Sequence, residues 1–143
     1  MFSFDEMEKT ACQIISPTLI SPTFISSTFI SSTQLNKYVQ YGHVAAVILS
    51  QSGHIYTGIS INTACSMGFC AEHGAIADML KQRESRIMKV IAVNQHGNII
   101  PPCGRCREFI SQIHRDNIHA EVKVNKELIL PLGELLPFDW KNV

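Results

Sequence analysis

The chain has 143 residues, 45% of them hydrophobic, and its 12 basic and 12 acidic side chains give a formal net charge of zero. This length allows one hydrophobic core but not two, so a single domain over residues 1–143 is predicted. The neutral balance, without a run of lysine or arginine, argues against a nucleic-acid partner. No apolar stretch reaches the length of a membrane span.

The first six residues carry acidic rather than basic side chains, so no signal peptide is predicted. Five cysteines without a secretion signal are typical of a reducing compartment, and a cytoplasmic location is expected. Cys12 and Cys65 lie outside the motifs described below and are expected to be small buried side chains.

A helix is predicted over residues 5–15, because acidic residues occupy its first turn and Pro17 limits its extension. Residues 15–34 then hold four imperfect copies of a five-residue unit of the form Ile-Ser-Pro/Ser-Thr-x. A period of five fits neither helix nor strand, and four copies are too short for a solenoid. An extended link between the first helix and the sheet is therefore expected, with a helix beginning near Ser27 or Ser32 as the alternative.

The remaining chain alternates between strand and helix patterns. The apolar run 43–49 and the segment 54–61 flank a turn at 51–53, which predicts a hairpin. The further elements are helices over 71–82, 103–114 and 131–136, and strands over 86–93, 119–124 and 127–130. This order predicts an α/β fold with a mixed sheet and helices on both of its faces.

Two short motifs contain the candidate metal ligands. The segment 102–106, Pro-Cys-Gly-Arg-Cys, holds a Cys-x-x-Cys pair that can close on one metal ion, and Cys70 can supply a third thiol. Three protein ligands leave one tetrahedral position open, as in a catalytic zinc site. Glu72 is near enough to handle a proton of a water molecule at the metal without being a ligand. Both motifs lie at predicted helix starts, where the helix dipole lowers thiol pKa values.

A Cys-x-x-Cys pair alone is also typical of a redox site or of half a structural zinc site. A structural site would need a fourth ligand, for which Cys65, His73 and His96 are the candidates. Because Cys70, Glu72, Pro102 and Gly104 accompany the pair, the sequence favours the catalytic interpretation.

The stretch Cys-Ala-Glu (70–72), followed by Pro-Cys-Gly-x-Cys-Arg (102–107), resembles the cytidine deaminase family. The resemblance extends from about Tyr41 to Trp140 and is nearest to small enzymes of the cytidine deaminase and blasticidin-S deaminase type. It implies a three-layer α/β/α sandwich with a mixed five-stranded sheet, one Zn²⁺ per chain held by Cys70, Cys103 and Cys106, and a homotetramer.

The resemblance also implies the reaction, which is hydrolytic deamination of a cytosine-type nucleoside, cytidine or deoxycytidine, to the uracil form with release of ammonia. Glu72 would take a proton from the attacking water and return protons to the ring nitrogen and the leaving amine. One alternative is deamination of a cytosine-containing antibiotic such as blasticidin S. Another is a non-catalytic zinc-binding relative, against which the presence of Glu72 argues.

At the substrate positions of the family this chain carries other residues. Ser60 and Asn62 stand where family members have an asparagine and a glutamate that hold the ribose hydroxyls, and His43 replaces an aromatic residue or a serine. A histidine half in solvent at a strand start is the alternative for His43. The implied substrate-binding set comprises His43, Ser60, Asn62, Ala71, Phe138 and Trp140, although Phe138 and Trp140 would look the same as core or subunit-contact residues.

Around the metal, many family members have an arginine after Cys-Ala-Glu that donates hydrogen bonds to the thiolates. His73 stands there in this chain, and an imidazole can do the same. Arg107 is the alternative group for offsetting the thiolate charge.

Overall fold

The computed structural model describes residues 1–15 and 33–142, so the expected link over 15–34 lies outside the described residues except at its two ends. The helices are α1 (Phe4–Ile15), α2 (Ala71–Lys81) and α3 (Gly104–Ile113). The strands are β1 (Thr33–Gln34), β2 (Val39–Ser50), β3 (Ile55–Thr63), β4 (Ile87–Asn94), β5 (Ile99–Ile100), β6 (Glu121–Lys123) and β7 (Ile129–Pro131). Short 3₁₀ turns cover Ala64–Ser66, Arg115–His119, Leu132–Leu135 and Trp140–Asn142.

The seven strands of the described residues belong to one mixed sheet, in which β1, β2, β4, β6 and β7 follow one another, β3 pairs with β2, and β5 pairs with β4. The expected hairpin is confirmed, since β2 and β3 pair antiparallel. Only the pairing of β4 with β6 is parallel among the described strands, and α3 lies in the connection between these two strands. Parallel neighbours require such a crossover.

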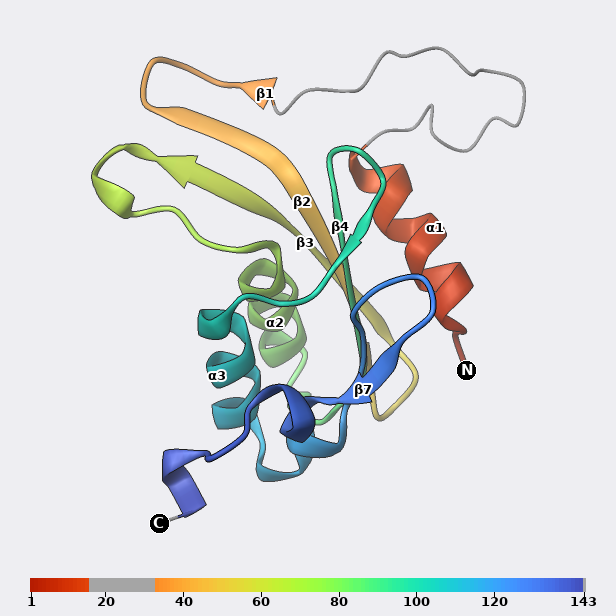
Figure 1. The fold of residues 1–143 in the computed structure, drawn as a ribbon. Coiled ribbons are helices and arrows are strands. Elements are labelled where there is room, and N and C mark those ends of the chain that lie inside the picture. Colours follow the sequence, from red (N-terminus) through yellow and green to blue (C-terminus); the bar gives the residue numbers. More distant parts are fainter. Residues whose placement is uncertain (16–32, 143) are drawn as a thin grey trace.

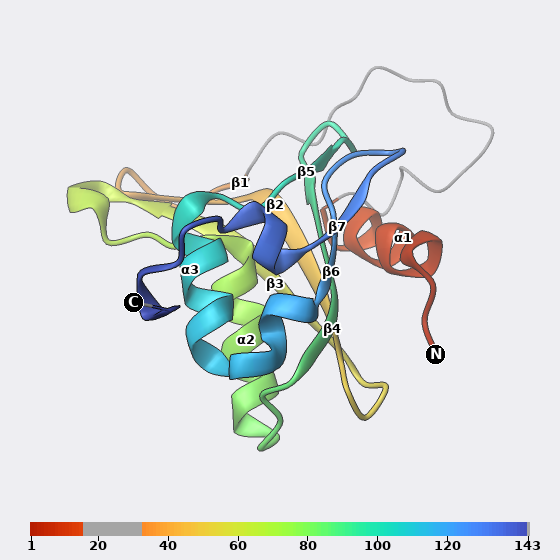
Figure 2. The ribbon, with the colours of Figure 1, turned by 60° about the horizontal axis from the view of Figure 1, so that its bottom comes forward.

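Helices cover both faces of the sheet, which confirms the three-layer α/β/α architecture (Figure 1 and Figure 2). On one face, α1 buries Met7 and Ala11 against Val47 of β2. On the other face, α2 and α3 pack side chains such as Ile76 against Ile48 of the same strand. Successive side chains of a strand point to opposite faces, so the part of β2 that lies between the two layers must be apolar at consecutive positions, as it is over residues 44–49.

The described residues form seven strands instead of the expected five, and the two additional strands, β1 and β5, have two residues each. Two residues cannot display a period of 2, so no pattern in the sequence predicts either strand. β2 also begins at Val39, earlier than expected, and extends with β3 beyond the helices as a ribbon (Figure 1). The predicted helix over 131–136 is a 3₁₀ turn, Leu132–Leu135.

Gly58 of β3 sets how closely α2 approaches the sheet. A Cβ atom at this position would lie 2.1 Å from the backbone oxygen of Ala71 and 2.6 Å from the backbone nitrogen of Ala75. Only glycine permits this approach. The first turn of α2, which carries Glu72, is therefore seated directly on β3.

Among the described helices, none is long and apolar enough to cross a membrane.

Candidate metal centre and substrate cavity

The two sequence motifs meet at the starts of two neighbouring helices. Cys70 is the N-cap residue of α2, Cys103 is the N-cap residue of α3, and Cys106 lies in the first turn of α3. Both helices lie on the same face of the sheet (Figure 1). Their N-terminal ends therefore place partial positive charge beside three thiols. The sequence predicted lowered thiol pKa values from this charge, but burial opposes it, and only the pKa of Cys103 is lowered.

The three thiols and one carboxylate converge. The Sγ atoms of Cys70 and Cys103 are 3.5 Å apart, and the Cys106 thiol donates to Oε2 of Glu72 over 3.3 Å. Glu72 is only 4% exposed, so its carboxylate faces the protein interior rather than bulk solvent. The structure thus brings together the four residues that the motifs pointed to.

Without a metal, the three thiols have different pKa values. Burial raises the pKa of Cys70, and it also raises that of Cys106 with help from the nearby Glu72 carboxylate. Burial disfavours the Cys103 thiolate as well, but hydrogen bonds from the Cys106 backbone and from the other two thiols bring its pKa below the usual value. Metal binding at this centre must therefore displace protons.

His73 lies closer to this centre than the sequence indicated. One of its ring nitrogens and the sulfurs of Cys70 and Cys106 all lie within 4.8 Å of one another. Its Nε2 atom is buried and has no hydrogen-bond partner among the described residues. The ring packs edge-on against Phe109, with centroids 4.8 Å apart. Burial, and secondly the charge of Arg105, lowers the pKa of His73 and favours a neutral imidazole.

This donor set fits zinc. Thiolates and a neutral imidazole are the ligands that Zn²⁺ prefers, and the orphaned Nε2 atom of His73 is explained if it faces a bound ion or a thiolate. Cys70, His73 and Cys106 form one cluster of donors, and the Cys103 sulfur lies 3.5 Å from that of Cys70. Binding by all four would close the tetrahedron, whereas binding by three would leave a position for another molecule.

A cavity of about 350 Å³ adjoins the thiols and includes four of the six predicted substrate residues. Its lining consists of His43, Val44, Ser60, Asn62, Gly68, Phe69, Cys70, Ala71, Glu72, Ile100, Pro101, Cys103 and Arg105. Metal donors, a buried carboxylate and polar groups from β2 and β3 thus share one space. Such a combination in one pocket is typical of an active site.

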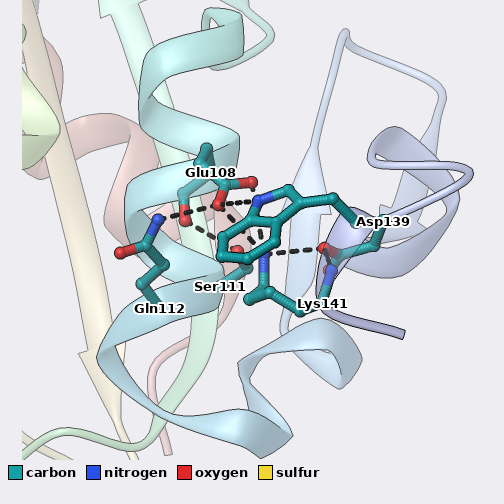
Figure 3. A network of polar contacts seen from close by, with 6 residues as sticks. Glu108, Ser111, Gln112, Asp139 and Lys141 are labelled. Carbon is teal, nitrogen blue, oxygen red and sulfur yellow. Dashed lines mark hydrogen bonds and ion pairs between the residues drawn. The ribbon is translucent and has the colours of Figure 1, made fainter. Parts of the chain in front are cut away.

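Phe138 and Trp140 do not line this cavity. Phe138 is fully exposed, and Trp140 donates from Nε1 to Oε1 of Glu108 over 2.9 Å. The Nζ atom of Lys141 donates to the same carboxylate, so the C-terminal segment packs against α3 (Figure 3). Within one chain, therefore, the structure does not bring these two aromatic residues to the predicted substrate set.

Arg107 contacts backbone oxygens. Its Nε atom donates to the carbonyl of Pro102 over 2.8 Å, and its NH1 atom donates to the carbonyl of Leu135 over 3.1 Å. These bonds fix the backbone just before Cys103 against the turn Leu132–Leu135. Of the two groups expected near the thiolates, His73 is the one that the structure places beside them.

The sequence reasoning missed several lining residues, including Phe69, Ile100 and Pro101. Each lies one or two residues before a motif, so nearness to the motif in the sequence was the signal that could have identified these lining residues. Phe69 is held in place by an isolated bridge to Ile61 of β3. No periodic pattern could have shown this contact.

Comparison with known proteins agrees with this geometry. The profile of the family described as "Cytidine and deoxycytidylate deaminase zinc-binding region" matches residues 28–122. The chain is 28% identical over 103 residues to a cytidine deaminase of Mycobacterium tuberculosis, covering 70% of this chain and 75% of the relative. A cytidine deaminase of Sporosarcina psychrophila is 33% identical over 78 residues, 52% of this chain and 57% of the relative.

Solved structures share the fold. The crystal structure of a cytidine deaminase from Mycobacterium tuberculosis superposes with a TM-score of 0.73 at 18% identity, covering 98% of each chain. The cytidine deaminase from Bacillus anthracis gives a TM-score of 0.68 at 21% identity, covering 96% of this chain and 89% of that chain.

Proposed function

The chain belongs to the cytidine and deoxycytidylate deaminase family, and from this premise we propose that it hydrolyses the exocyclic C–N bond of a cytosine nucleoside. Cytidine and deoxycytidine are the proposed substrates, and the products are the uracil nucleoside and ammonia. One observation carries the proposal. The buried Glu72 carboxylate, 3.3 Å from the Cys106 sulfur, lines the same cavity as Cys70 and Cys103.

We assign the metal to the thiolates of Cys70, Cys103 and Cys106, with one ion per chain. Zinc bound there supplies a Lewis acid that lowers the pKa of water from 15.7 toward roughly 7. The neutral His73 is assigned to donate its Nε2 proton to a thiolate, which satisfies its orphaned nitrogen.

Glu72 is assigned the proton transfers. Its carboxylate accepts a proton from the attacking water as oxygen adds to the ring carbon that bears the amine. It then delivers that proton to the adjacent ring nitrogen. A second transfer moves the remaining proton of the added hydroxyl to the amine, so that the C–N bond breaks, ammonia leaves and the carbonyl of the uracil form is produced. Because the side chain is only 4% exposed, bulk water has little access to compete for these protons.

Replacing one carboxylate oxygen of Glu72 by an amide nitrogen tests its role in proton transfer. We expect Glu72→Gln to lower the turnover of cytidine by at least about 10²-fold, because general acid–base help is typically worth 10² to 10⁴. The measurement is ammonia release by zinc-loaded protein from cytidine, deoxycytidine, blasticidin S and adenosine, with the zinc content determined in parallel.

The matched control is Glu127→Gln, which changes an exposed carboxylate in the loop between β6 and β7 and should keep full activity. Near-normal turnover by a zinc-loaded Glu72→Gln protein would contradict the assignment. Wild-type protein that holds zinc but deaminates none of these compounds would contradict the proposed activity.

The two alternatives have less support. The similar curated proteins are named cytidine deaminases, which does not favour blasticidin S as the substrate. A non-catalytic zinc protein would have no use for a buried carboxylate at the thiols.

A homotetramer and a cytoplasmic location remain predictions. Large exposed apolar side chains support self-association, notably Met67 at 76%, Trp140 at 65% and the fully exposed Phe138. Light scattering coupled to gel filtration would measure the assembly, and a monomer at micromolar concentration would rule out the tetramer.

A further inference from the structure

His43 lies in an irregular part of β2. In the pairing of β2 with β3, Tyr41 opposes Ile61 while Ala45 opposes Ile59, so three residues of β2 face the single residue Ser60. Gly42 has a φ of +86°, in the left-handed region that favours glycine. A bulge of this kind bends a strand and redirects its side chains. Here the redirected side chain is His43, which lines the cavity.

Ser60 stabilises the bulge through a hydrogen bond to the backbone of β2. Its Oγ atom accepts a hydrogen bond of 3.0 Å from the backbone amide of Val44. The bulge takes that amide out of the regular ladder with β3, and an amide partly shielded from water needs another partner. Ser60 is itself 7% exposed, so this bond is well shielded from solvent. One acceptor position of the Ser60 hydroxyl is therefore taken by this structural bond.

Asn62 determines which ring nitrogen of a neutral His43 carries the proton. The Nδ2 atom of Asn62 lies 3.1 Å from Nδ1 of His43. An amide nitrogen can only donate, so Nδ1 must be the acceptor and the proton of the neutral ring resides on Nε2. Asn62 thus turns His43 into a donor at Nε2.

The positions of these residues indicate which part of a substrate they meet. Glu72 is buried, whereas Asn62 is exposed and His43 is half-buried. A base whose amine reaches Glu72 therefore points its substituent toward the rim, where His43 lies. A donor at this place selects an acceptor oxygen on the substrate.

We propose that His43 binds the sugar side of the substrate by donating from Nε2 to a sugar oxygen, and that Ser60 and Asn62 are positioning residues that act through it. This inference rests on the proposed function. It makes the cavity a site that offers a hydrogen-bond donor to the sugar, instead of a carboxylate that accepts from two hydroxyls.

Variants of His43 test the donor. His43→Phe keeps a planar ring but removes the donor, and we expect it to raise KM for cytidine about tenfold with a much smaller change in kcat. His43→Gln retains an amide donor and should stay within about threefold of wild type. The matched control is His119→Phe in the turn Arg115–His119, where the cavity does not extend. Equal losses in the Phe and Gln variants would overturn the donor role.

A double-mutant cycle tests the positioning role of Asn62. We expect Asn62→Leu to raise KM about threefold in the wild-type background and to have no further effect in His43→Phe protein. A full additional loss in that background would mean that Asn62 contacts the substrate itself.

Nitrogen NMR of zinc-loaded protein with ¹⁵N-labelled histidine gives a readout independent of turnover. We expect Nε2 to be protonated and Nδ1 unprotonated in the wild type, and Asn62→Asp to move a proton onto Nδ1. A protonated Nδ1 in the wild type would overturn the inference. If no cytosine nucleoside were turned over, the proposed function would fail, while the NMR result would still decide whether Asn62 sets the tautomer.

Discussion

At the residue scale, Cys103 and His73 are two candidates for the third ligand of the proposed metal ion. Cys103 belongs to the Cys-x-x-Cys pair and has its sulfur 3.5 Å from that of Cys70. His73 follows Cys70 by three residues, so the helix places both on one face, and its nitrogen lies within 4.8 Å of two sulfurs. Three ligands leave an open position whether the third is Cys103 or His73, whereas binding by all three thiolates together with His73 would close the tetrahedron.

Zinc content separates these two sets of ligands. We expect Cys103→Ser to lower zinc affinity by more than about 100-fold, because hydroxyl is a poor substitute for thiolate. His73→Gln should lose only about 10- to 100-fold if it only orients the thiolates. Competition with a chromogenic chelator measures both affinities.

Cys65→Ser serves as the control, since Cys65 is an exposed thiol outside the cluster. The reverse ranking, with zinc retained in Cys103→Ser and lost in His73→Gln, would make the centre a Cys₂His site.

At the scale of elements, the active centre depends on the contact between β3 and α2. The helix approaches so closely that Gly58 has no space for a side chain, and the same helix start presents Cys70 and Glu72. The position of these residues is therefore set by a strand on which neither of them lies.

Gly58→Ala should disturb both stability and the metal centre. The added Cβ would lie 2.1 Å from a backbone oxygen, and overpacking of this kind costs typically about 1–3 kcal/mol. We expect a lower midpoint of urea unfolding together with weaker zinc binding, because α2 must move away from the sheet.

Gly74→Ala is the matched control, since its Cβ would make only an ordinary contact at 3.5 Å and alanine favours the helix. Unchanged stability and zinc affinity in Gly58→Ala would show that the contact does not position the centre.

At the scale of the whole molecule, two carboxylates tie distant segments together. Glu84 accepts hydrogen bonds from Ser52 and Tyr56 and pairs with His54, joining the β2–β3 hairpin to the segment after α2. Glu108 of α3 accepts from Trp140 and Lys141 of the C-terminal segment (Figure 3). Hydrogen bonds, first of all from serine hydroxyls, lower the pKa of Glu84 from 4.5 to about 2. Hydrogen bonds, first of all from Gln112, lower the pKa of Glu108 from 4.5 to about 2.

These carboxylates predict how stability depends on pH. Their pKa values are lower in the folded than in the unfolded chain, so their stabilisation is present above about pH 4.5 and is lost as the pH falls toward 2. We expect Tm to decline across this window. The double variant Glu84→Gln, Glu108→Gln should have a lower Tm at pH 7 and a shallower decline in acid.

Thermal unfolding between pH 7 and pH 2.5 measures both effects, with Glu127→Gln as the control. A decline in the double variant that is as steep as in the wild type would assign the acid sensitivity to other groups.

The sequence by itself determined the layers and the chemistry of the centre. The uninterrupted apolar run in β2 requires cover on both faces, which α1 and the pair α2 and α3 provide. The ligand motifs are also local, because the residue types and their spacing relative to a helix start are written in adjacent positions. Physical rules that act over a few residues can be applied to the chain alone.

Tertiary structure alone decided which residues meet across the fold. The bulge that redirects His43 exists only in the register between β2 and β3, and the buried Asn117 reveals its partners, Ile87 and Ile110, only once β4 and α3 have packed. The same holds for Trp140, which the sequence assigned to the cavity but which is bound to Glu108 instead. Contacts of this kind join residues far apart in the chain, and their geometry depends on how whole elements pack.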